Sequence, residues 1–318
     1  MFKVSKNGKD FIYNAVQIQG AEIDKESIQP GSYLKYTGTG WVGDVDVISA
    51  TGVEYSDYIF WDNIESKWEV GSDKVHIGGN AGQINQDTRA VAIGYNAGSN
   101  NQGQNSVAIG LESGRYTQGI DCVAIGSNSG NQYQGDGAIS IGSSSGLNTQ
   151  GTNAVAIGYQ AGQYTQGVNS VTIGYQAGRT SGGYNGVAIG SDCGHYQQGM
   201  CVAIGLNAGY NSQQGYSVAI GAGSGFNTQG YYGIAIGADA GRDNQRTASI
   251  AIGYFAGKTV QLSQSIAIGY QAGLGNQGAS AVSIGTNAGQ FSQNSSCIAI
   301  GTSAGTVVIT VNCSGGLE

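Results

Sequence analysis

The sequence has little charge, almost no proline and only two histidines. Of its 318 residues, 10% are charged and one is proline, whereas 57 are glycine. So few charges exclude a coiled coil or a charge-rich disordered chain, and a single proline excludes collagen. No apolar run approaches the ~18 residues that would span a bilayer, so we expect no membrane insertion.

The few charges are unevenly distributed. Residues 1–74 carry seven lysines and twelve carboxylates, a net charge of −5, whereas residues 75–318 carry six basic and eight acidic groups, a net charge of −2. Neither part has the basic surface that nucleic-acid binding requires, so no nucleic-acid partner is expected. The first eight residues are not followed by the apolar core of a signal peptide, which predicts a chain that does not enter the general secretion route.

Groups that carry chemistry are scarce. The five cysteines are an odd number without regular spacing, which fits neither a disulfide framework nor a zinc site. They are Cys122, Cys193, Cys201, Cys297 and Cys313. We expect small buried thiols in a chain assembled in a reducing cytosol. Because no nucleophile–base pair or carboxylate pair recurs, we expect no enzymatic activity, no catalytic residue, no metal and no cofactor.

A motif of the type Val-Ala-Ile-Gly dominates the sequence from residue 75 onward. Successive copies are 16 residues apart, except for one spacing of 15 between Val187 and Val202. The fifteen copies begin at Val75, Val91, Val107, Val123, Ile139, Val155, Val171, Val187, Val202, Val218, Ile234, Ile250, Ile266, Val282 and Ile298. A fixed period of this length predicts a solenoid. The expected fold is all-β, a parallel β-roll of about fifteen 16-residue coils over residues 75–305.

Each position of the repeat, counted from its first apolar residue, accepts few residue types. Positions 1 and 3 are always Val or Ile, position 2 is mostly Ala, and positions 4 and 8 are always Gly. Position 12 is Gln in thirteen of the fourteen copies that reach a following copy, with Gly182 as the exception. The predicted structural residues therefore include Gly94, Gly98, Gly110, Gly114, Gln102 and Gln118. Glycine after a short strand indicates a disfavoured backbone angle or a close approach of neighbouring backbone.

The alternation at positions 1 to 3 predicts a short strand with Val and Ile on one face. We expect that face to point inward, with the glutamines forming a hydrogen-bonded amide ladder between coils. In the alternative, the glutamines lie outside on a turn.

The alanines of position 2 would then point outward and line a homotrimer interface, because small apolar residues let rods pack closely. The candidates are Ala92, Ala108, Ala124, Ala156 and Ala188. In the alternative, alanine fills a tight position within one chain.

The one 15-residue coil lacks a residue between Gly199 and Cys201. We expect the turn to shorten there while Val202 and Ile204 keep the inward orientation assigned to their columns. A slip carried into the strand would reverse its faces.

The copies resemble a known family. Asn105-Ser106-Val107-Ala108-Ile109-Gly110, like residues 169–174, is similar to the head repeat of trimeric autotransporter adhesins, the YadA-like family. The resemblance covers about residues 75–305 and implies a left-handed parallel β-roll, with three chains side by side. The family's common repeat is slightly shorter than 16, and its signal peptide, coiled-coil stalk and barrel anchor are not visible in this sequence.

Residues 1–74 differ in kind, because they hold all three tryptophans, the only proline and most of the charge. They predict a small β-rich module that either attaches the chain to a base, capsid or tail protein or caps the solenoid. Residues 34–42 and 66–70 resemble short β elements of phage and virus tail-fibre proteins. Residues 306–318 are expected to form a capping strand and tail.

These observations favour a structural fibre or surface-appendage protein of a phage or other virus. It would be assembled in the host cytoplasm, lie on the virion surface as a homotrimer, and mediate attachment to a host receptor or glycan. A bacterial trimeric adhesin-like protein at the cell surface is the alternative.

Exposed tyrosines are the predicted contact residues, since aromatic faces beside amides suit glycan binding. The position-5 candidates are Tyr95, Tyr159, Tyr175, Tyr254 and Tyr270. In the alternative, these rings only shield turn backbone.

Overall fold

The computed structural model of the chain describes residues 57–62, 65–180, 182–196 and 199–305, and the backbone of six strands between Phe2 and Asp44. All the regular elements of these residues are strands, and none of their segments is a helix that could cross a membrane. The chain divides into two compact units, Met1–Ser72 and Asp73–Glu318. The predicted C-terminal strand over residues 306–318, with Cys313, lies outside the described residues.

The N-terminal unit contains short, mostly antiparallel strands. β1 pairs with β2, β3 to β6 form a sheet in the order β3-β4-β6-β5, and β7 pairs with β8. Their bounds are β1 Phe2–Lys6, β2 Lys9–Tyr13, β3 Gln17–Ile18, β4 Ala21–Ile23, β5 Tyr33–Tyr36, β6 Gly40–Asp44, β7 Ile59–Asp62 and β8 Lys67–Val70. In the β7–β8 hairpin, Trp61 lies opposite Trp68, with ring centroids 5.5 Å apart and edge to face. Attachment and capping both stay predictions for this unit.

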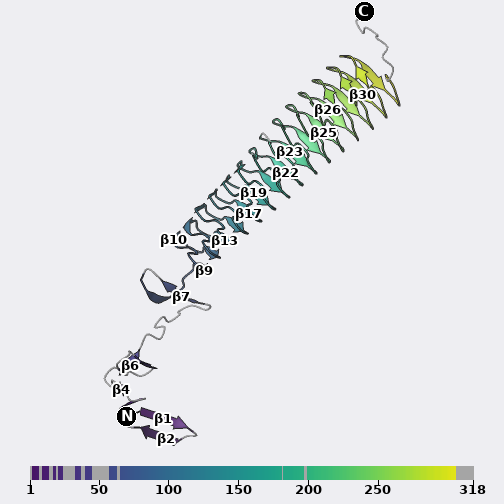
Figure 1. Cartoon of the computed structure of the whole chain (residues 1–318). Helices are drawn as coiled ribbons and strands as arrows, with labels where there is room; N and C mark the ends of the chain where they lie inside the picture. The colour runs from purple at the N-terminus through teal and green to yellow at the C-terminus, as the bar shows by residue number, and fades with distance from the viewer. Residues whose placement is uncertain are drawn as a thin grey trace, which may run out of the picture. The chain divides into compact units, whose positions relative to one another are not determined.

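The second unit is a parallel β-solenoid whose coils stack one after another (Figure 1). The Val-Ala-Ile segments form one 15-stranded parallel sheet in register, so the predicted all-β solenoid with a coil of about 16 residues is confirmed. Its strands are β9 Val75–Ile77, β11 Val91–Ile93, β13 Val107–Ile109, β15 Val123–Ile125, β17 Ile139–Ile141, β19 Val155–Ile157, β21 Val171–Ile173, β22 Val187–Ile189, β23 Val202–Ile204, β24 Val218–Ile220, β25 Ile234–Ile236, β26 Ile250–Ile252, β28 Ile266–Ile268, β30 Val282–Ile284 and β32 Ile298–Ile300.

The glutamine segments form the opposite side of the coil as two shorter parallel sheets. A six-stranded sheet comprises β10 Ile84–Gln86, β12 Asn100–Gln102, β14 Thr117–Gln118, β16 Tyr133–Gln134, β18 Thr149–Gln150 and β20 Thr165–Gln166. A three-stranded sheet comprises β27 Val260–Gln261, β29 Asn276–Gln277 and β31 Ser292–Gln293. Between these sheets the described coils are joined on this side by single bridges, such as Gln213 to Gln229.

The interior of the coil is lined by small residues, and the predicted orientation of the strands is wrong. From Ala92 onward the position-2 side chains are buried, and His76 of the first coil is half-buried, whereas Val and Ile of positions 1 and 3 are half-buried or exposed on the outer face. The five alanines proposed for the trimer interface, Ala92, Ala108, Ala124, Ala156 and Ala188, are each 0% exposed inside their own chain. They therefore cannot line a contact with another chain, and the alternative, alanine in a tight position of one coil, is correct.

Glutamine explains why the interior is narrow. Among the described residues, the largest fully buried side chains are ten position-12 glutamines, which are larger than Thr172 and Cys122. They occupy the space that Val and Ile would need. Side chains of positions 7 and 16, which are Ala, Ser, Cys or Gly, fill the remaining interior. Because these glutamines already fill most of the interior, the opposite strand can contribute little more than a methyl or hydroxymethyl group.

The buried amide nitrogens donate to backbone carbonyl groups and, in part of the stack, to one another. Gln150 Nε2 donates to the carbonyl oxygens of Ile139 at 2.8 Å and Ala154 at 3.1 Å, and it lies 3.0 Å from Gln166 Oε1. Links of this kind join Gln118 to Gln166 in one run and Gln245 to Gln293 in another, so the amide ladder is confirmed over these coils. Between described coils outside these runs, an oxygen such as Gln229 Oε1 lacks a hydrogen-bond partner.

Both glycine columns have the predicted special backbone. Gly110, at position 4, has a φ of +124°, and a Cβ there would lie 2.8 Å from the carbonyl oxygen of Gly126 in the next coil. Gly98, at position 8, has a φ of +51°, and a Cβ there would lie 2.6 Å from Oε1 of Gln102. Position 4 thus permits close coil stacking, and position 8 leaves room for the buried amide.

The 15-residue coil keeps its register, although the reason given for it was wrong. Val187 pairs with Val202 and Ile189 with Ile204, and Met200 takes a left-handed φ of +62° in the shortened turn. The turn therefore absorbs the missing residue, as predicted. Burial of Val202 is not the cause, because Ala203 is the buried residue and Val202 is half-buried.

Candidate binding surfaces

The outer face of the 15-stranded sheet is a continuous apolar surface. We call it the Val/Ile face: it consists of positions 1 and 3 of the fifteen coils. Along the middle of the stack Ile125, Ile141 and Ile236 are 36–37% exposed, and at the last coil Ile298 is 72% exposed. Successive side chains of a strand point to opposite faces, so burial of position 2 places positions 1 and 3 on the outer face. Sequence reasoning missed this surface because it assigned the bulkier residues to the interior.

The predicted tyrosines lie on the surface at the turn that follows the sheet. Tyr95, Tyr159, Tyr175, Tyr254 and Tyr270 are all 45–57% exposed. The structure brings four of them together as two pairs. Tyr159 and Tyr175 stack with ring centroids 5.4 Å apart, and Tyr254 and Tyr270 stack at 5.5 Å. Tyr95 lies apart from both pairs, between coils that carry Gly79 and Leu111 at this position.

A second aromatic column, at position 9, was not predicted. His195 stacks on Tyr210 at 5.1 Å, and Tyr210 stacks on Phe226 at 5.2 Å, with interplanar angles of 5° and 7°. The Arg242 guanidinium carbon lies 5.3 Å from the centre of the Phe226 ring. Aligning position 9 of successive coils would have revealed this column, since its aromatic members are consecutive.

His195 is the titratable member of the column. Burial and the positive charge of Arg179 lower its pKa below the ordinary value, while Asp192 opposes the shift. Its Nε2 lies 3.3 Å from the hydroxyl of Thr180, and its Nδ1 is buried without a hydrogen-bond partner. The neutral imidazole in this stack therefore acts as an aromatic spacer between coils.

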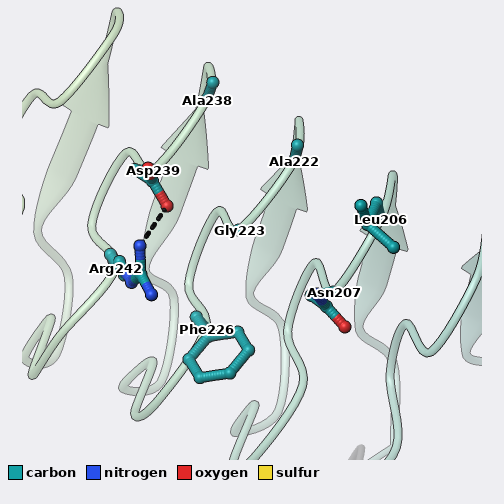
Figure 2. Close-up of a pocket in the computed structure, with 8 residues that line it drawn as sticks. All are labelled: Leu206, Asn207, Ala222, Gly223, Phe226, Ala238, Asp239 and Arg242. Atoms are coloured by element: carbon teal, nitrogen blue, oxygen red, sulfur yellow. Dashed lines mark hydrogen bonds and ion pairs between the residues drawn. The ribbon is translucent and has the colours of Figure 1, made fainter.

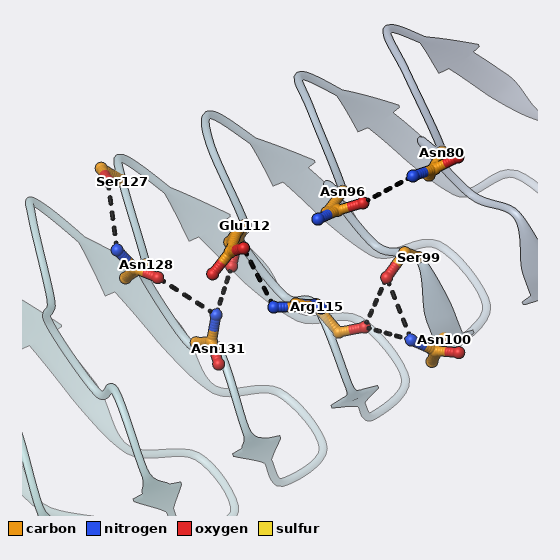
Figure 3. A network of polar contacts seen from close by, with 9 residues as sticks. All are labelled: Asn80, Asn96, Ser99, Asn100, Glu112, Arg115, Ser127, Asn128 and Asn131. Carbon is orange, nitrogen blue, oxygen red and sulfur yellow. Dashed lines mark hydrogen bonds and ion pairs between the residues drawn. The ribbon is translucent and has the colours of Figure 1, made fainter.

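Polar side chains also form ladders on the turns (Figure 3). Asn80 donates to Oδ1 of Asn96 in the next coil at 3.0 Å, and Arg115 pairs with Glu112 at 2.9 Å. Asn80, Asn96 and Glu112 all have left-handed backbone angles near +55°. Asparagine tolerates such angles better than most residues, which accounts for its frequency at position 6.

Cys122, Cys193 and Cys201 are free, buried thiols, as expected, whereas Cys297 is half-buried. Burial raises the pKa of Cys122 to about 11 and that of Cys193 to about 12. Such thiols stay protonated at neutral pH and pack as small residues. In the described part of the chain, no group of three or more His, Cys, Asp or Glu side chains could hold a metal ion.

No family model, curated protein or solved structure matches the chain. The stacked parallel coils show a β-roll. The resemblance to the YadA-like family rests on the repeat pattern of the sequence alone.

Proposed function

We propose that this chain is a non-enzymatic structural protein that forms a homotrimeric rod and projects from the surface of a phage or other virus to attach it to its host. The observation that carries the proposal is the Val/Ile face. It runs along all fifteen coils, and its β-branched side chains contact water in a single chain. Monomeric proteins rarely expose so large a continuous apolar surface.

A closed trimer would remove this face from water. Three copies packed around an axis would each bury the Val/Ile face. Because the symmetry is closed, no Val/Ile face would remain exposed to bind further copies. The rod would then present its turns outward, with the tyrosine column and the polar ladders available for contact. The YadA-like repeat pattern agrees with this arrangement, and the interface is the Val/Ile face instead of the alanine column.

The viral setting is supported by the sequence. The likeness of residues 34–42 and 66–70 to tail-fibre elements, together with the free cysteines, favours a particle assembled in a reducing cytoplasm. Residues 1–74 would then bind a base, capsid or tail protein. A bacterial adhesin-like protein at the cell surface is the second candidate, favoured by the repeat pattern alone.

Light scattering of the full chain tests the trimer. The expected molar mass is three times the chain mass of 32.4 kDa. The double variant Ile109→Lys, Ile173→Lys should be monomeric with an unchanged strand signal in circular dichroism, because charge on this face cannot be buried without a partner. Ser127→Lys together with Ser143→Lys adds the same charge at position 5 and should stay trimeric. A monomeric unmodified chain would overturn the proposal.

Imaging distinguishes the two settings. Gold-labelled antibodies against the rod should decorate fibres or surface projections of virus particles. Labelling of the bacterial surface in the absence of particles would favour the adhesin-like protein.

A further inference from the structure

Three neighbouring coils leave an open depression of about 230 Å³ on the surface of the rod (Figure 2). Its origin lies at positions 5 and 6. Ala222 and Ala238 occupy position 5 between Leu206 and Tyr254, which are 54% and 45% exposed, and Gly223 occupies position 6. Ala-Gly is the smallest pair that any coil carries at these two positions. The depression therefore lies where two consecutive coils carry alanine at position 5 and the first of them carries glycine at position 6.

The apolar side of the depression includes Leu206 and Phe226. The Phe226 ring is fixed between neighbours, because Tyr210 stacks on it at 5.2 Å and the Arg242 guanidinium lies 5.3 Å from its centre. A ring held in this way presents its edge to an occupant without losing further side-chain freedom, which favours binding.

The polar groups of the depression carry no net charge. Arg242 Nη1 donates to Asp239 Oδ1 at 2.9 Å, and both side chains are partly exposed. Asn207 adds an amide with both donor and acceptor atoms. Asp239 can accept hydrogen bonds, Arg242 has further N–H groups to donate, and Asn207 can do either.

We propose that this depression binds one neutral sugar ring. The inference rests on the proposed role in surface attachment, and it names the class of ligand. A sugar ring has apolar C–H faces and a rim of hydroxyl groups that both donate and accept, which matches alanine, leucine and phenylalanine beside a carboxylate, a guanidinium and an amide. The paired charges give no reason to prefer an anionic or cationic ligand. A trimer would carry three equal sites, so weak single contacts would combine into firm attachment.

Saturation-transfer NMR on the full chain tests the inference. The probes are the methyl glycosides of glucose, galactose, mannose and N-acetylglucosamine, with a blocked alanine dipeptide as the non-sugar probe. We expect transfer to at least one glycoside. The variant Ala222→Tyr should reduce affinity at least tenfold, because it fills the depression with the residue that several other coils carry at position 5. Asp239→Asn should also weaken binding, since it keeps a residue suited to the left-handed backbone and removes the carboxylate.

Ser143→Tyr is the matched control, since it places the same ring at position 5 of a distant coil and should leave binding unchanged. Equal melting temperatures would show that all three variants are folded. Transfer to no glycoside, transfer to the dipeptide alone, or full binding by Ala222→Tyr would each overturn the inference. If the chain is a trimer and labels virus particles but binds no glycoside, this inference fails while the proposed function stands.

Discussion

Glycine at position 4 is required for two reasons, a positive φ and a close contact with the next coil, and mutation can separate them. In Gly110→Ala, the new residue must adopt a φ of +124°, and its Cβ would lie 2.8 Å from the carbonyl oxygen of Gly126. We therefore expect the free energy of unfolding to fall by about 3 kcal/mol or more. In Gly301→Ala, the new residue must adopt a φ of +117°, but no atom lies within 4 Å of its Cβ. The free energy of unfolding should fall by only about 1–2 kcal/mol. Thermal or urea unfolding followed by circular dichroism gives both values. Equal losses would show that coil stacking is not the tighter constraint.

The buried glutamines should be costly to remove. Gln150 is 0% exposed and also accepts a hydrogen bond from Ser140 Oγ at 2.7 Å. Gln150→Ala would leave a cavity and unpaired carbonyl groups, and should destabilise the rod by about 3 kcal/mol. Gln132→Ala, at an exposed turn position two residues before Gln134, should change stability by less than about 0.5 kcal/mol. A shift of similar size in both variants would contradict the proposed role of the amide.

At the residue scale, the sequence predicts the spacing of the repeat positions better than it predicts which side chains point into the interior. The glycine and glutamine columns could be predicted because each residue type suits a particular backbone angle or ladder. The direction of Val-Ala-Ile could not, because an alternating pattern tells which residues share a face and leaves open which face is inside. The usual preference for burying the larger apolar residue failed here, since interior width is set jointly by the coil length and by Gln150 and its equivalents.

Among the elements of the rod, the shortened turn can be tested by insertion. One residue added between Gly199 and Met200 restores 16 residues and should change stability by less than about 1 kcal/mol, because other coils carry that residue. One residue added between Ala203 and Ile204 shifts the strand by one position and turns the outer side chains inward. That variant should lose its cooperative unfolding transition. Tolerance of both insertions would contradict the claim that the strand register is fixed by its buried face.

The position-9 column predicts a pH effect. The pKa of His195 is lowered in the folded chain, so below the ordinary value of about 6.5 the unfolded chain binds more protons than the folded one. Stability from this group is fully present above that pH and falls as the pH drops through it.

His195→Phe keeps the stack and removes the titration, so its melting temperature should fall less between pH 7.5 and pH 5 than that of the unmodified chain. Tyr210→Phe keeps both the stack and His195, and should show the full decrease. An identical decrease in His195→Phe and the unmodified chain would exclude His195 as the cause.

For the whole molecule, the number of coils, their parallel pairing and their register follow from one period repeated along the chain. Surface sites follow less directly. The tyrosine pairs form because equal positions of adjacent coils become neighbours in space, which a column alignment can predict. The depression beside Phe226 depends on the small size of Ala222 and Gly223. In a sequence with so many glycine, alanine and serine residues, two small residues do not indicate a surface depression.

The central claim is that alanine and glutamine fill the interior while Val and Ile form the outer face. Two adjacent residues test it most directly, because Ala156 is 0% exposed and Ile157 is half-buried on the opposite face of the same strand. Far-ultraviolet circular dichroism and light scattering should be measured on Ala156→Lys and Ile157→Lys. We expect Ala156→Lys to lose its strand signal, and Ile157→Lys to keep it while the trimer weakens. A folded Ala156→Lys beside an unfolded Ile157→Lys would contradict the claim.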